Sequence, residues 1–358
     1  MKKVLLSFTL ICLVLFYMMA CFQTKKDTVL LDVSKDAPEM LSAFNFFKGE
    51  LKKLQPNKDV FPYDLNSTFF TDYAFKARFF YVPTGGKVAY QEKEALDLPV
   101  GSCYIKNFYY PADFSKPEGE RRIIETRILI HRKEGWEALP YVWNEAQTDA
   151  ALAVAGDIKE VTWKHYDGTT KNISYLVPNK NQCKSCHWNN TTIKPIGPTA
   201  KNLNRTLKFE DGEFNQLEKW KSLGYLQGLP QAANIPQMAN YNDTTLSLDT
   251  RARAYLDINC AHCHRENGAA YTSGLHLGWE MKDLEHLGVC KSPVAAGIGT
   301  GGLMIDIVPG APEKSILAYR MASTEAGIKM PELGRVLAHK EGVELINKWI
   351  LSMKGKCN

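Results

Sequence analysis

The sequence predicts an α+β multidomain protein. Its N-terminal domain is expected to be β-rich and sandwich- or barrel-like, and its C-terminal domain mostly α-helical. Residues 61–177 contain short aromatic and β-branched runs separated by turn residues, a pattern typical of antiparallel sheets. Beyond them, apolar residues recur at helical spacing in two segments. The 358 residues are 45% hydrophobic, enough for two or three packed units. We expect boundaries at 1–20, 38–180, 181–245 and 246–358.

Residues 1–20 have the pattern of a secretory signal peptide. Two lysines precede an apolar run at 4–20, which then gives way to polar residues. The run Met18-Met19-Ala20-Cys21 resembles a bacterial lipobox, although Met18 stands where Leu is usual. We therefore expect Cys21 to be lipidated and to anchor an exported, periplasmic protein to a membrane. A retained anchor helix is the alternative.

Strands are expected where β-prone runs lie between turn signals, mostly in antiparallel pairs. The turn signals are Gly85-Gly86, Pro111-Ala112-Asp113 and Asp167-Gly168. The expected strands are 78–82, 103–110, 123–130 and 173–177.

The segment 181–245 begins with a Cys-Lys-Ser-Cys-His motif at 183–187. Pro178 and the extended run before it lead straight into this motif, so we expect no helix before it. Residues 215–223 are expected to form a helix that ends at Gly224. A Pro- and Asn-rich link follows at 230–243.

Two helices are expected in the segment 246–358. Ser247 or Asp249 can cap a helix that runs into Cys260, where the motif Cys-Ala-His-Cys-His begins. Near the end of the chain, an apolar stripe at i, i+3, i+7 and i+10 predicts an amphipathic helix. The stripe is Val343, Ile346, Ile350 and Met353, flanked by Leu345 and Trp349.

The repeated C-x-x-C-H motif predicts two covalently attached c-type haems. Two thiols at this spacing can bond the two vinyl groups of one haem, and the His that follows binds its iron. Zinc ribbons space their C-x-x-C pairs more closely, and a redox dithiol needs no His after its second Cys. We expect covalent attachment through Cys183, Cys186, Cys260 and Cys263, with His187 and His264 as the proximal iron ligands.

Met330 is the candidate distal ligand of the second haem. Pro331 and Gly334 stiffen a loop just before the last helix, and a thioether ligand raises the haem potential. Met304 and Met321 are the alternative ligands. If Met330 does not bind iron, it is expected to fill space in the core. His262, inside the second motif, is expected at the surface.

The distal ligand of the first haem stays open. Met238, beside Pro236, is one candidate, and an iron with no sixth ligand is the alternative. In the open case Glu145 and Asp149 are candidate acid–base groups, although solvated loop carboxylates are the favoured interpretation of both. His131, His165 and His276 are weaker candidates for the ligand.

Three cysteines remain, Cys103, Cys290 and Cys357, and they allow at most one disulfide, whose partners the sequence leaves open. The net charge is +5, or +3 once the lysines at positions 2 and 3 are removed with the leader. Such a mild balance, with no Lys/Arg-rich block, excludes nucleic acid as the expected partner.

The C-terminal segment resembles bacterial cytochrome c-like domains that carry a P-G-x-P-E-x-S-x-L segment. The matching residues are Val308-Pro309-Gly310-Ala311-Pro312-Glu313, Ser315, Leu317, Met330-Pro331 and Trp349-Ile350.

Nearly all of the mature chain is similar to an uncharacterised family of exported bacterial dihaem lipoproteins. This resemblance implies haem binding and electron transfer, without naming a substrate. The stretches that carry it are Phe61-Pro62-Tyr63-Asp64-Leu65-Asn66, Glu125-Thr126-Arg127, Leu139-Pro140-Tyr141-Val142-Trp143-Asn144, Asn181-Gln182-Cys183, Ile196-Gly197-Pro198, Asn202-Leu203-Asn204-Arg205 and 251–264.

These observations predict a membrane-anchored dihaem cytochrome that exchanges electrons with redox partner proteins of the cell envelope. No catalytic residue is assigned. One alternative is an oxidoreductase whose open first haem sits on a β-domain resembling cytochrome P460. The other is a partner-binding module in which haem only stabilises the fold.

Overall fold

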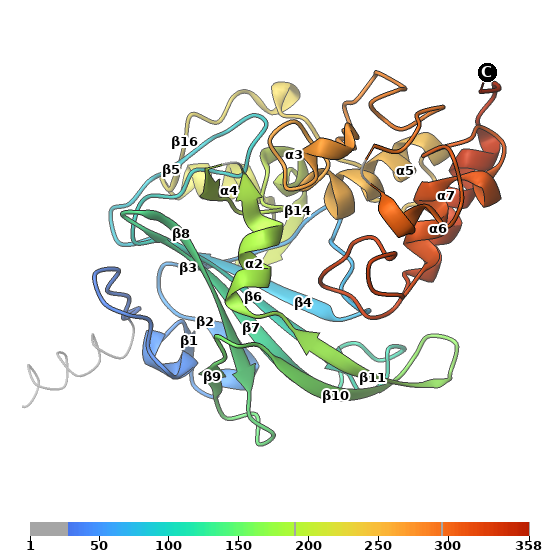
Figure 1. The fold of residues 1–358 in the computed structure, drawn as a ribbon. Helices are drawn as coiled ribbons and strands as arrows, with labels where there is room; N and C mark the ends of the chain where they lie inside the picture. The colour runs from blue at the N-terminus through green and yellow to red at the C-terminus, as the bar shows by residue number, and fades with distance from the viewer. Residues whose placement is uncertain (1–27, 190, 295, 358) are drawn as a thin grey trace, which may run out of the picture.

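The computed structural model describes residues 28–189, 191–294 and 296–357. The predicted signal peptide and the lipidation site Cys21 lie outside the described residues. The fold class is mixed, with a multi-stranded sheet and several helices, as the sequence predicts (Figure 1).

A six-stranded antiparallel sheet forms the centre of the N-terminal part, in the order β3-β4-β6-β7-β8-β9. The predicted runs at 78–82, 103–110 and 123–130 are confirmed as β4, β6 and β7. The strands are β3 (Val60–Tyr63), β4 (Phe75–Tyr81), β6 (Cys103–Pro111), β7 (Arg121–Arg132), β8 (Gly135–Trp143) and β9 (Ala150–Leu152).

The fourth predicted run belongs to a separate hairpin, β10 (Asp157–Lys164) with β11 (Thr170–Val177). This hairpin packs Trp163 and Tyr175 against Phe108 and Tyr110 of β6. Within the described chain, the edge strands β3 and β9 do not pair with each other. The sheet is therefore open, with a hairpin folded over one end. The sequence did not predict this arrangement, because β-prone runs predict strands but not their partners.

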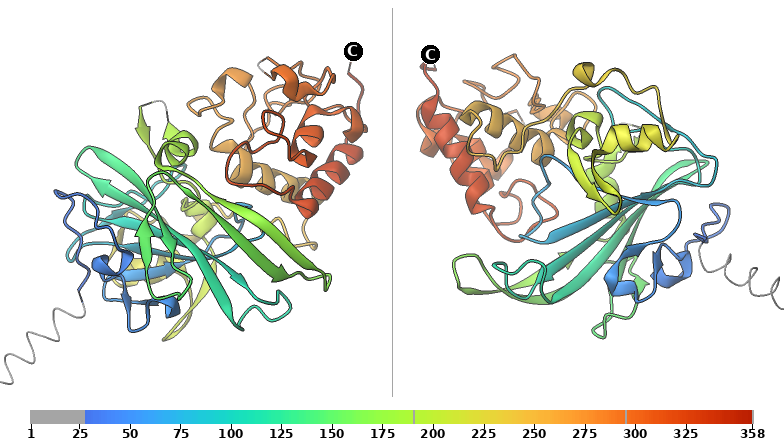
Figure 2. Two further views of the ribbon diagram at one scale, coloured as in Figure 1. Left: turned by 60° about the horizontal axis from the view of Figure 1, so that its bottom comes forward. Right: turned by 180° about the vertical axis from the view of Figure 1, so that it is seen from behind.

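The two faces of the sheet are covered by different parts of the chain (Figure 2). Phe79, Ile105 and Ile128 face the N-terminal segment, which includes a 3₁₀ turn at Leu41–Phe44. On the other face Phe80 packs against Trp220, with ring centroids 4.8 Å apart. Burial on both faces holds the register, since a one-residue slip would turn every side chain to the opposite face.

Among the described residues, two short helices and eight short strands surround the six-stranded sheet. The helices there are α3 (Ala200–Leu203) and α4 (Gln216–Ser222), and Asn215 caps α4 as the predicted helix requires. The short strands are β1 (Phe47–Lys48), β2 (Gln55–Pro56), β5 (Val88–Ala89), β12 (Trp188–Asn189), β13 (Thr192–Ile193), β14 (Thr206–Phe209), β15 (Gly212–Asn215) and β16 (Leu226–Gln227).

The first C-x-x-C-H motif lies in a helix, α2 (Lys180–His187), which the sequence analysis did not expect. The Asn179 side chain accepts a hydrogen bond from the Gln182 backbone N–H, and the Gln182 side chain accepts one from the Asn179 backbone N–H. This capping box starts the helix directly after Pro178. The extended run before Pro178 is confirmed as the end of β11, but the expectation that no helix precedes the motif was wrong, because α2 starts at Lys180.

The second motif follows α5 (Leu248–Leu256), which continues as a π-helical turn at Asp257–Ala261. Ser247 is the N-cap, since its hydroxyl accepts a hydrogen bond from the Thr250 N–H. Asp249 instead accepts one from the Trp349 indole N–H of α7, at 2.8 Å. The remaining helices are α6 (Ile316–Ala322) and α7 (Lys340–Ser352), and 3₁₀ turns lie at Leu51–Lys53, Ala232–Asn234, Tyr271–Ser273, Gly297–Thr300 and Pro312–Lys314.

Buried polar contacts join the C-terminal helices to the segment between β3 and β4. The Asp72 carboxylate accepts hydrogen bonds from the backbone N–H groups of Val336 and Leu337, both at 2.8 Å. The Asn259 side chain accepts one from the Phe70 N–H at 2.8 Å. These bonds place the second motif beside the face of the sheet that α2 covers.

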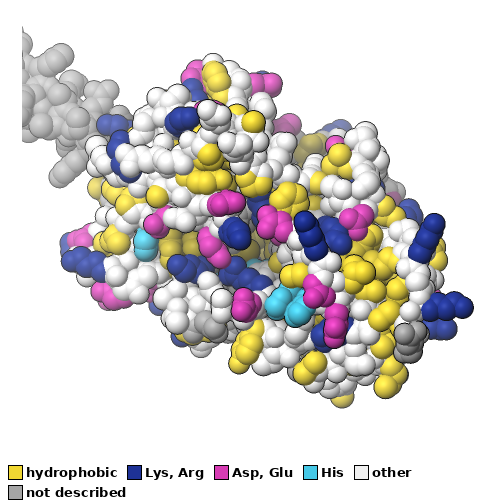
Figure 3. Space-filling model, turned by 90° about the horizontal axis from the view of Figure 1, so that it is seen from above, with side chains coloured by type: hydrophobic (Ala, Val, Ile, Leu, Met, Phe, Trp, Pro, Cys, Tyr) yellow, Lys and Arg dark blue, Asp and Glu magenta, His cyan; other side chains and the backbone are white. Residues whose placement is uncertain are grey.

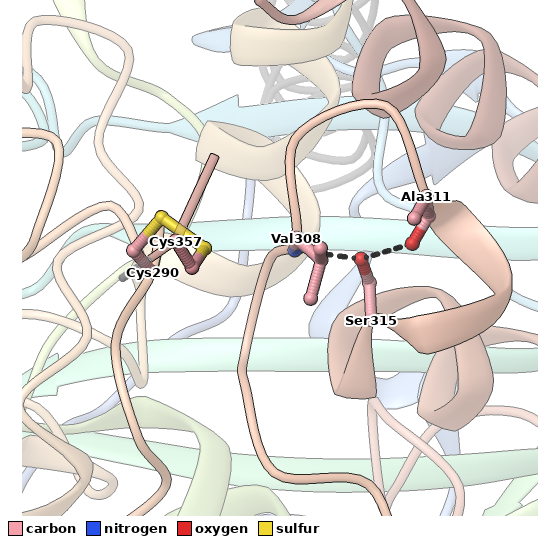
Figure 4. The surroundings of a disulfide bond; sticks show 5 residues. All are labelled: Cys290, Val308, Ala311, Ser315 and Cys357. Atoms are coloured by element: carbon pink, nitrogen blue, oxygen red, sulfur yellow. Dashed lines mark hydrogen bonds between the residues drawn. A yellow bond between two sulfur atoms is a disulfide. The ribbon is translucent and has the colours of Figure 1, made fainter. Parts of the chain in front are cut away.

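Cys290 and Cys357 form a disulfide with a Cα–Cα distance of 5.1 Å, the pairing that the sequence left open (Figure 4). Cys103 is buried and free. Nearby, the fully buried Ser315 hydroxyl accepts a hydrogen bond from the Val308 N–H and donates one to the Ala311 carbonyl. Ser315 thus closes the loop that precedes α6.

Among the residues that the structure describes, none of the helices has the length and apolar character needed to cross a bilayer.

Replacing both disulfide cysteines, Cys290→Ser with Cys357→Ser, is expected to lower the free energy of unfolding by about 2–5 kcal/mol. The bond closes a loop of 67 residues, and its loss frees the unfolded chain. Denaturant unfolding followed by tryptophan fluorescence measures the effect. Wild-type protein unfolded under reducing conditions is the control and should match the double variant; equal stability of oxidised wild type and variant would contradict the prediction.

Candidate haem sites

The first motif places its three functional side chains on one side of α2. Cys183, Cys186 and His187 stand at positions i, i+3 and i+4, which share a helix face. Both cysteines are free thiols. They line what we call the sheet-side cavity, together with Tyr104, Lys106 and Arg127 of the sheet. It continues past Lys76, Arg78 and Phe108 to His262.

The His187 ring is held in one tautomer. Its Nδ1 lies 2.7 Å from the Lys194 carbonyl oxygen, which can only accept, so Nδ1 carries the proton. The lone pair therefore stays on Nε2. Burial lowers the pKa of His187 to about 4, which leaves the ring neutral at neutral pH. A neutral imidazole fixed through Nδ1 is the form that binds a metal.

The second motif has the same arrangement on a different element. Cys260 and Cys263 are free thiols at the end of α5. Cys260, Cys263, His264 and Met330 line what we call the helix-side cavity. It extends past Ser273 and Arg320 to Asp306. Met330 is thus brought to the same cavity as His264, from a loop far along the chain.

The His264 tautomer is also determined by its neighbours. The Ser273 hydroxyl donates its one proton to the Ala270 carbonyl, at 2.7 Å. His264 Nδ1 lies 3.0 Å from the same oxygen and must therefore donate. Nε2 again keeps its lone pair, and burial lowers the pKa of His264 to about 4. Both motifs therefore present two thiols and one metal-binding nitrogen.

The donor set fits a haem at each motif, because two thiols for covalent attachment and one metal-binding nitrogen line each cavity. In the described part of the chain, no group of three or more His, Cys, Asp or Glu side chains is placed to hold a bare metal ion.

The two cavities share a wall. Cys186, His262 and Leu333 line both of them. Cys186 lies close enough to Cys263 for its charge to contribute to the raised pKa of that thiol, whose main cause is burial. Two motifs separated by more than seventy residues in sequence therefore face each other across a few side chains.

His262 is half-buried, whereas the sequence predicted a surface position. Its Nδ1 is buried and has no hydrogen-bond partner within the described residues, and its ring makes an edge contact with Phe69 at 5.4 Å. Burial, followed by the proximity of His187 and His264, lowers its pKa to about 3. The sequence could not predict the exposure of His262 from its place between two cysteines, because the side chains that cover His262 come from other segments.

The other candidate ligands lie elsewhere. Met238 is 2% exposed and packs in the core around α5 and α7, so the structure does not bring it to the sheet-side cavity. Met304 is 75% exposed, whereas Met321 is buried in the C-terminal core. The three weaker histidine candidates make other contacts: His131 stacks on Trp136, His165 accepts a hydrogen bond from the Trp163 indole, and His276 stacks on His286.

The two candidate acid–base groups, Glu145 and Asp149, do not line either cavity. Glu145 forms an exposed ion pair with Arg122 at 2.7 Å. Asp149 accepts hydrogen bonds from the backbone N–H and the hydroxyl of Ser42. Their contacts are those of surface structural groups.

A row of cations crosses the sheet beside His187. Arg78, Lys106 and Arg127 stand directly opposite one another on β4, β6 and β7. Lys76, one pleat further, lies 5.6 Å from the Phe108 ring. In Figure 3, Lys and Arg side chains and His side chains lie around a hollow on one face of the molecule. Sequence alternation indicates which strand positions share a face, but the row needs the register between strands.

Comparison with protein-family models, curated proteins and solved structures finds no match to this chain.

Replacing Arg127 with Met is expected to lower the free energy of unfolding by about 3–5 kcal/mol. The Arg127 guanidinium is the cationic partner of Glu125, which is 0% exposed and would be left as an uncompensated buried charge. Arg122→Met is the matched control, because its pair with Glu145 is exposed and contributes at most about 1 kcal/mol. Urea unfolding measures both; equal effects would contradict the assignment.

Proposed function

We propose that this protein is an exported dihaem c-type cytochrome that carries electrons in the cell envelope. The observation that carries the proposal is the paired site geometry. At each motif two free thiols and a histidine with a free Nε2 line one cavity. Haem, when bound, supplies one-electron chemistry at a potential set by its ligands and surroundings.

Each residue of the two motifs has a role in this proposal. Cys183 and Cys186 would hold the first haem and His187 its iron. Cys260, Cys263 and His264 would do the same for the second. Met330 supports the second site further, because it lines the helix-side cavity together with His264. A thioether opposite a histidine suits an electron carrier, since it raises the potential.

The shared wall supports electron transfer between the sites. Electron exchange requires two redox groups to lie close together with little solvent between them. Cys186 belongs to both cavities, and Leu333 and the half-buried His262 also line both of them. The two proposed haem sites are therefore neighbours that share these side chains.

Two further features are compatible with an envelope location. A disulfide between Cys290 and Cys357 is typical of oxidising compartments. The predicted lipid on Cys21 would keep the protein at a membrane, near redox partner proteins. The order α5, second motif, Met330 loop and α7 also matches that of a small cytochrome c domain, which we propose for residues 246–358.

The oxidoreductase with an open first haem is the second candidate. In the part of the chain that the structure describes, no methionine lines the sheet-side cavity, and Met238 is packed elsewhere. His262 lines the same cavity as His187 and could supply a second iron ligand; without such a ligand the first haem would have an open position. A high-spin haem that binds carbon monoxide would identify the open case.

Mass spectrometry of the mature protein, produced with a cytochrome c maturation system, tests the main proposal. The expected mass includes two haems. Cys260→Ala with Cys263→Ala should remove one, and Cys183→Ala with Cys186→Ala the other. Cys103→Ala, which alters a free thiol outside both motifs, is the control and should leave both. A wild-type mass without haem would overturn the proposal.

Met330→Ala is expected to leave both haems attached and to lower the potential of one by on the order of 100 mV. Loss of the thioether removes the ligand that favours the reduced iron. Redox titration followed by visible absorption measures the shift, and the long-wavelength band of Met-ligated ferric haem should disappear. Met304→Ala, at a residue that is 75% exposed, is the control. An unchanged potential in Met330→Ala would exclude this ligand.

A further inference from the structure

The walls of the sheet-side cavity carry an unbalanced charge. Lys76, Arg78, Lys106 and Arg127 line it, and no carboxylate is among its described lining residues. Like charges directly opposite each other on neighbouring strands destabilise a sheet. Three of these four cations stand in that relation, one on each of three adjacent strands. A counter-charge nearby would therefore stabilise such a row.

The carboxylates outside the cavity balance only part of the row. Arg127 pairs with Glu125 at 2.8 Å. Arg78 pairs with Asp64 at 2.9 Å, and Asp64 also binds Arg205 at 2.8 Å. Two cations of the row thus have partners, and one of these partners is shared with a cation from outside the cavity.

Two donors in the row lack partners. Arg78 is 5% exposed, yet its buried Nε has no hydrogen-bond partner. Lys106 Nζ has no hydrogen bond or ion pair within the described residues, whereas Lys76 Nζ donates to the Ala74 carbonyl at 3.0 Å. The Asp72 carboxylate instead accepts hydrogen bonds from the backbone of Val336 and Leu337. A buried donor is almost always satisfied, so the Arg78 Nε points to a missing acceptor, and the half-buried Lys106 stands opposite Arg78 on β6.

We propose that the sheet-side cavity binds an anionic oxygen group, a carboxylate or small oxyanion, among Arg78, Lys106 and Arg127. The planar donors of the two arginines suit two-oxygen acceptors, and Lys106 adds a point charge between them. Tyrosine and aliphatic side chains also line the cavity, and apolar surroundings strengthen contacts of this kind.

Two sources supply this chemistry. One is a small anion from solution, such as nitrite, and this case does not depend on haem. The other is a propionate carboxylate of the first haem, and this case rests on the proposed function. The two are distinguishable because only the free anion is in exchange with solvent.

The test uses the full-length mature protein and the variant Lys106→Gln. Calorimetric titration with sodium nitrite, at constant ionic strength, measures binding of the free anion. Binding to wild type that is weakened about tenfold or more in Lys106→Gln supports a free-anion site. The control is Lys164→Gln. Lys164 lies on the β10–β11 hairpin, is 53% exposed and pairs with Asp113, so this variant should bind nitrite like wild type.

The haem-carboxylate case has its own readout. Wild type then binds no nitrite, but Lys106→Gln lowers the potential of one haem, because a removed cation favours the oxidised iron. Lys164→Gln should not shift it. If Lys106→Gln has the same nitrite affinity and the same two haem potentials as wild type, the inference is wrong.

A second variant and a mass measurement distinguish failure of the anion site from failure of the cytochrome proposal. Arg78→Gln should act in the same direction as Lys106→Gln, and circular dichroism verifies that each variant is folded. If the mature protein contains no haem but nitrite still binds in a Lys106-dependent way, the anion site stands and the cytochrome proposal falls. If haem is present and neither variant has an effect, the anion site falls alone.

Discussion

The register of β4, β6 and β7 is the constraint on which the rest of the molecule depends. It places Phe80, Tyr104 and Leu129 in one row, where they form the apolar floor beneath α2 and α4. The next row of the same face holds three cations. Because side chains alternate strictly along a strand, the two rows are fixed relative to each other. The first motif therefore lies over a boundary between apolar and cationic surface.

The N-terminal caps of two helices position the two C-x-x-C-H motifs. The capping box of Asn179 and Gln182 turns the chain from β11 into α2, so that both thiols and the histidine project to one side. At the second motif, Ser247 begins α5 and the π-helical turn carries Cys260 onward. In both places a local hydrogen bond then fixes the histidine of the motif. Pre-organisation of this kind lowers the entropic cost of binding a cofactor.

Much of the fold was predictable because local signals agreed with the tertiary structure. The runs that became β4, β6, β7 and β11 are rich in residues that suit a half-buried pleat, and the terminal stripe became α7. The start of α2 was missed, because the Asn179 and Gln182 signal followed a proline that pointed to extended chain. The placement of Met238 in the C-terminal core depends on long-range packing that neither spacing nor a nearby proline encodes.

The sequence by itself determined the chemistry: two thiol pairs, each followed by a histidine, and the helix and strand signals around them. These are properties of neighbouring residues, which local spacing reports directly. Only the tertiary structure decided that the two motifs share a wall, that His262 lies half-buried in it and that Arg78, Lys106 and Arg127 meet beside His187. Strand register and packing bring those residues together, and both depend on contacts between segments far apart in the chain.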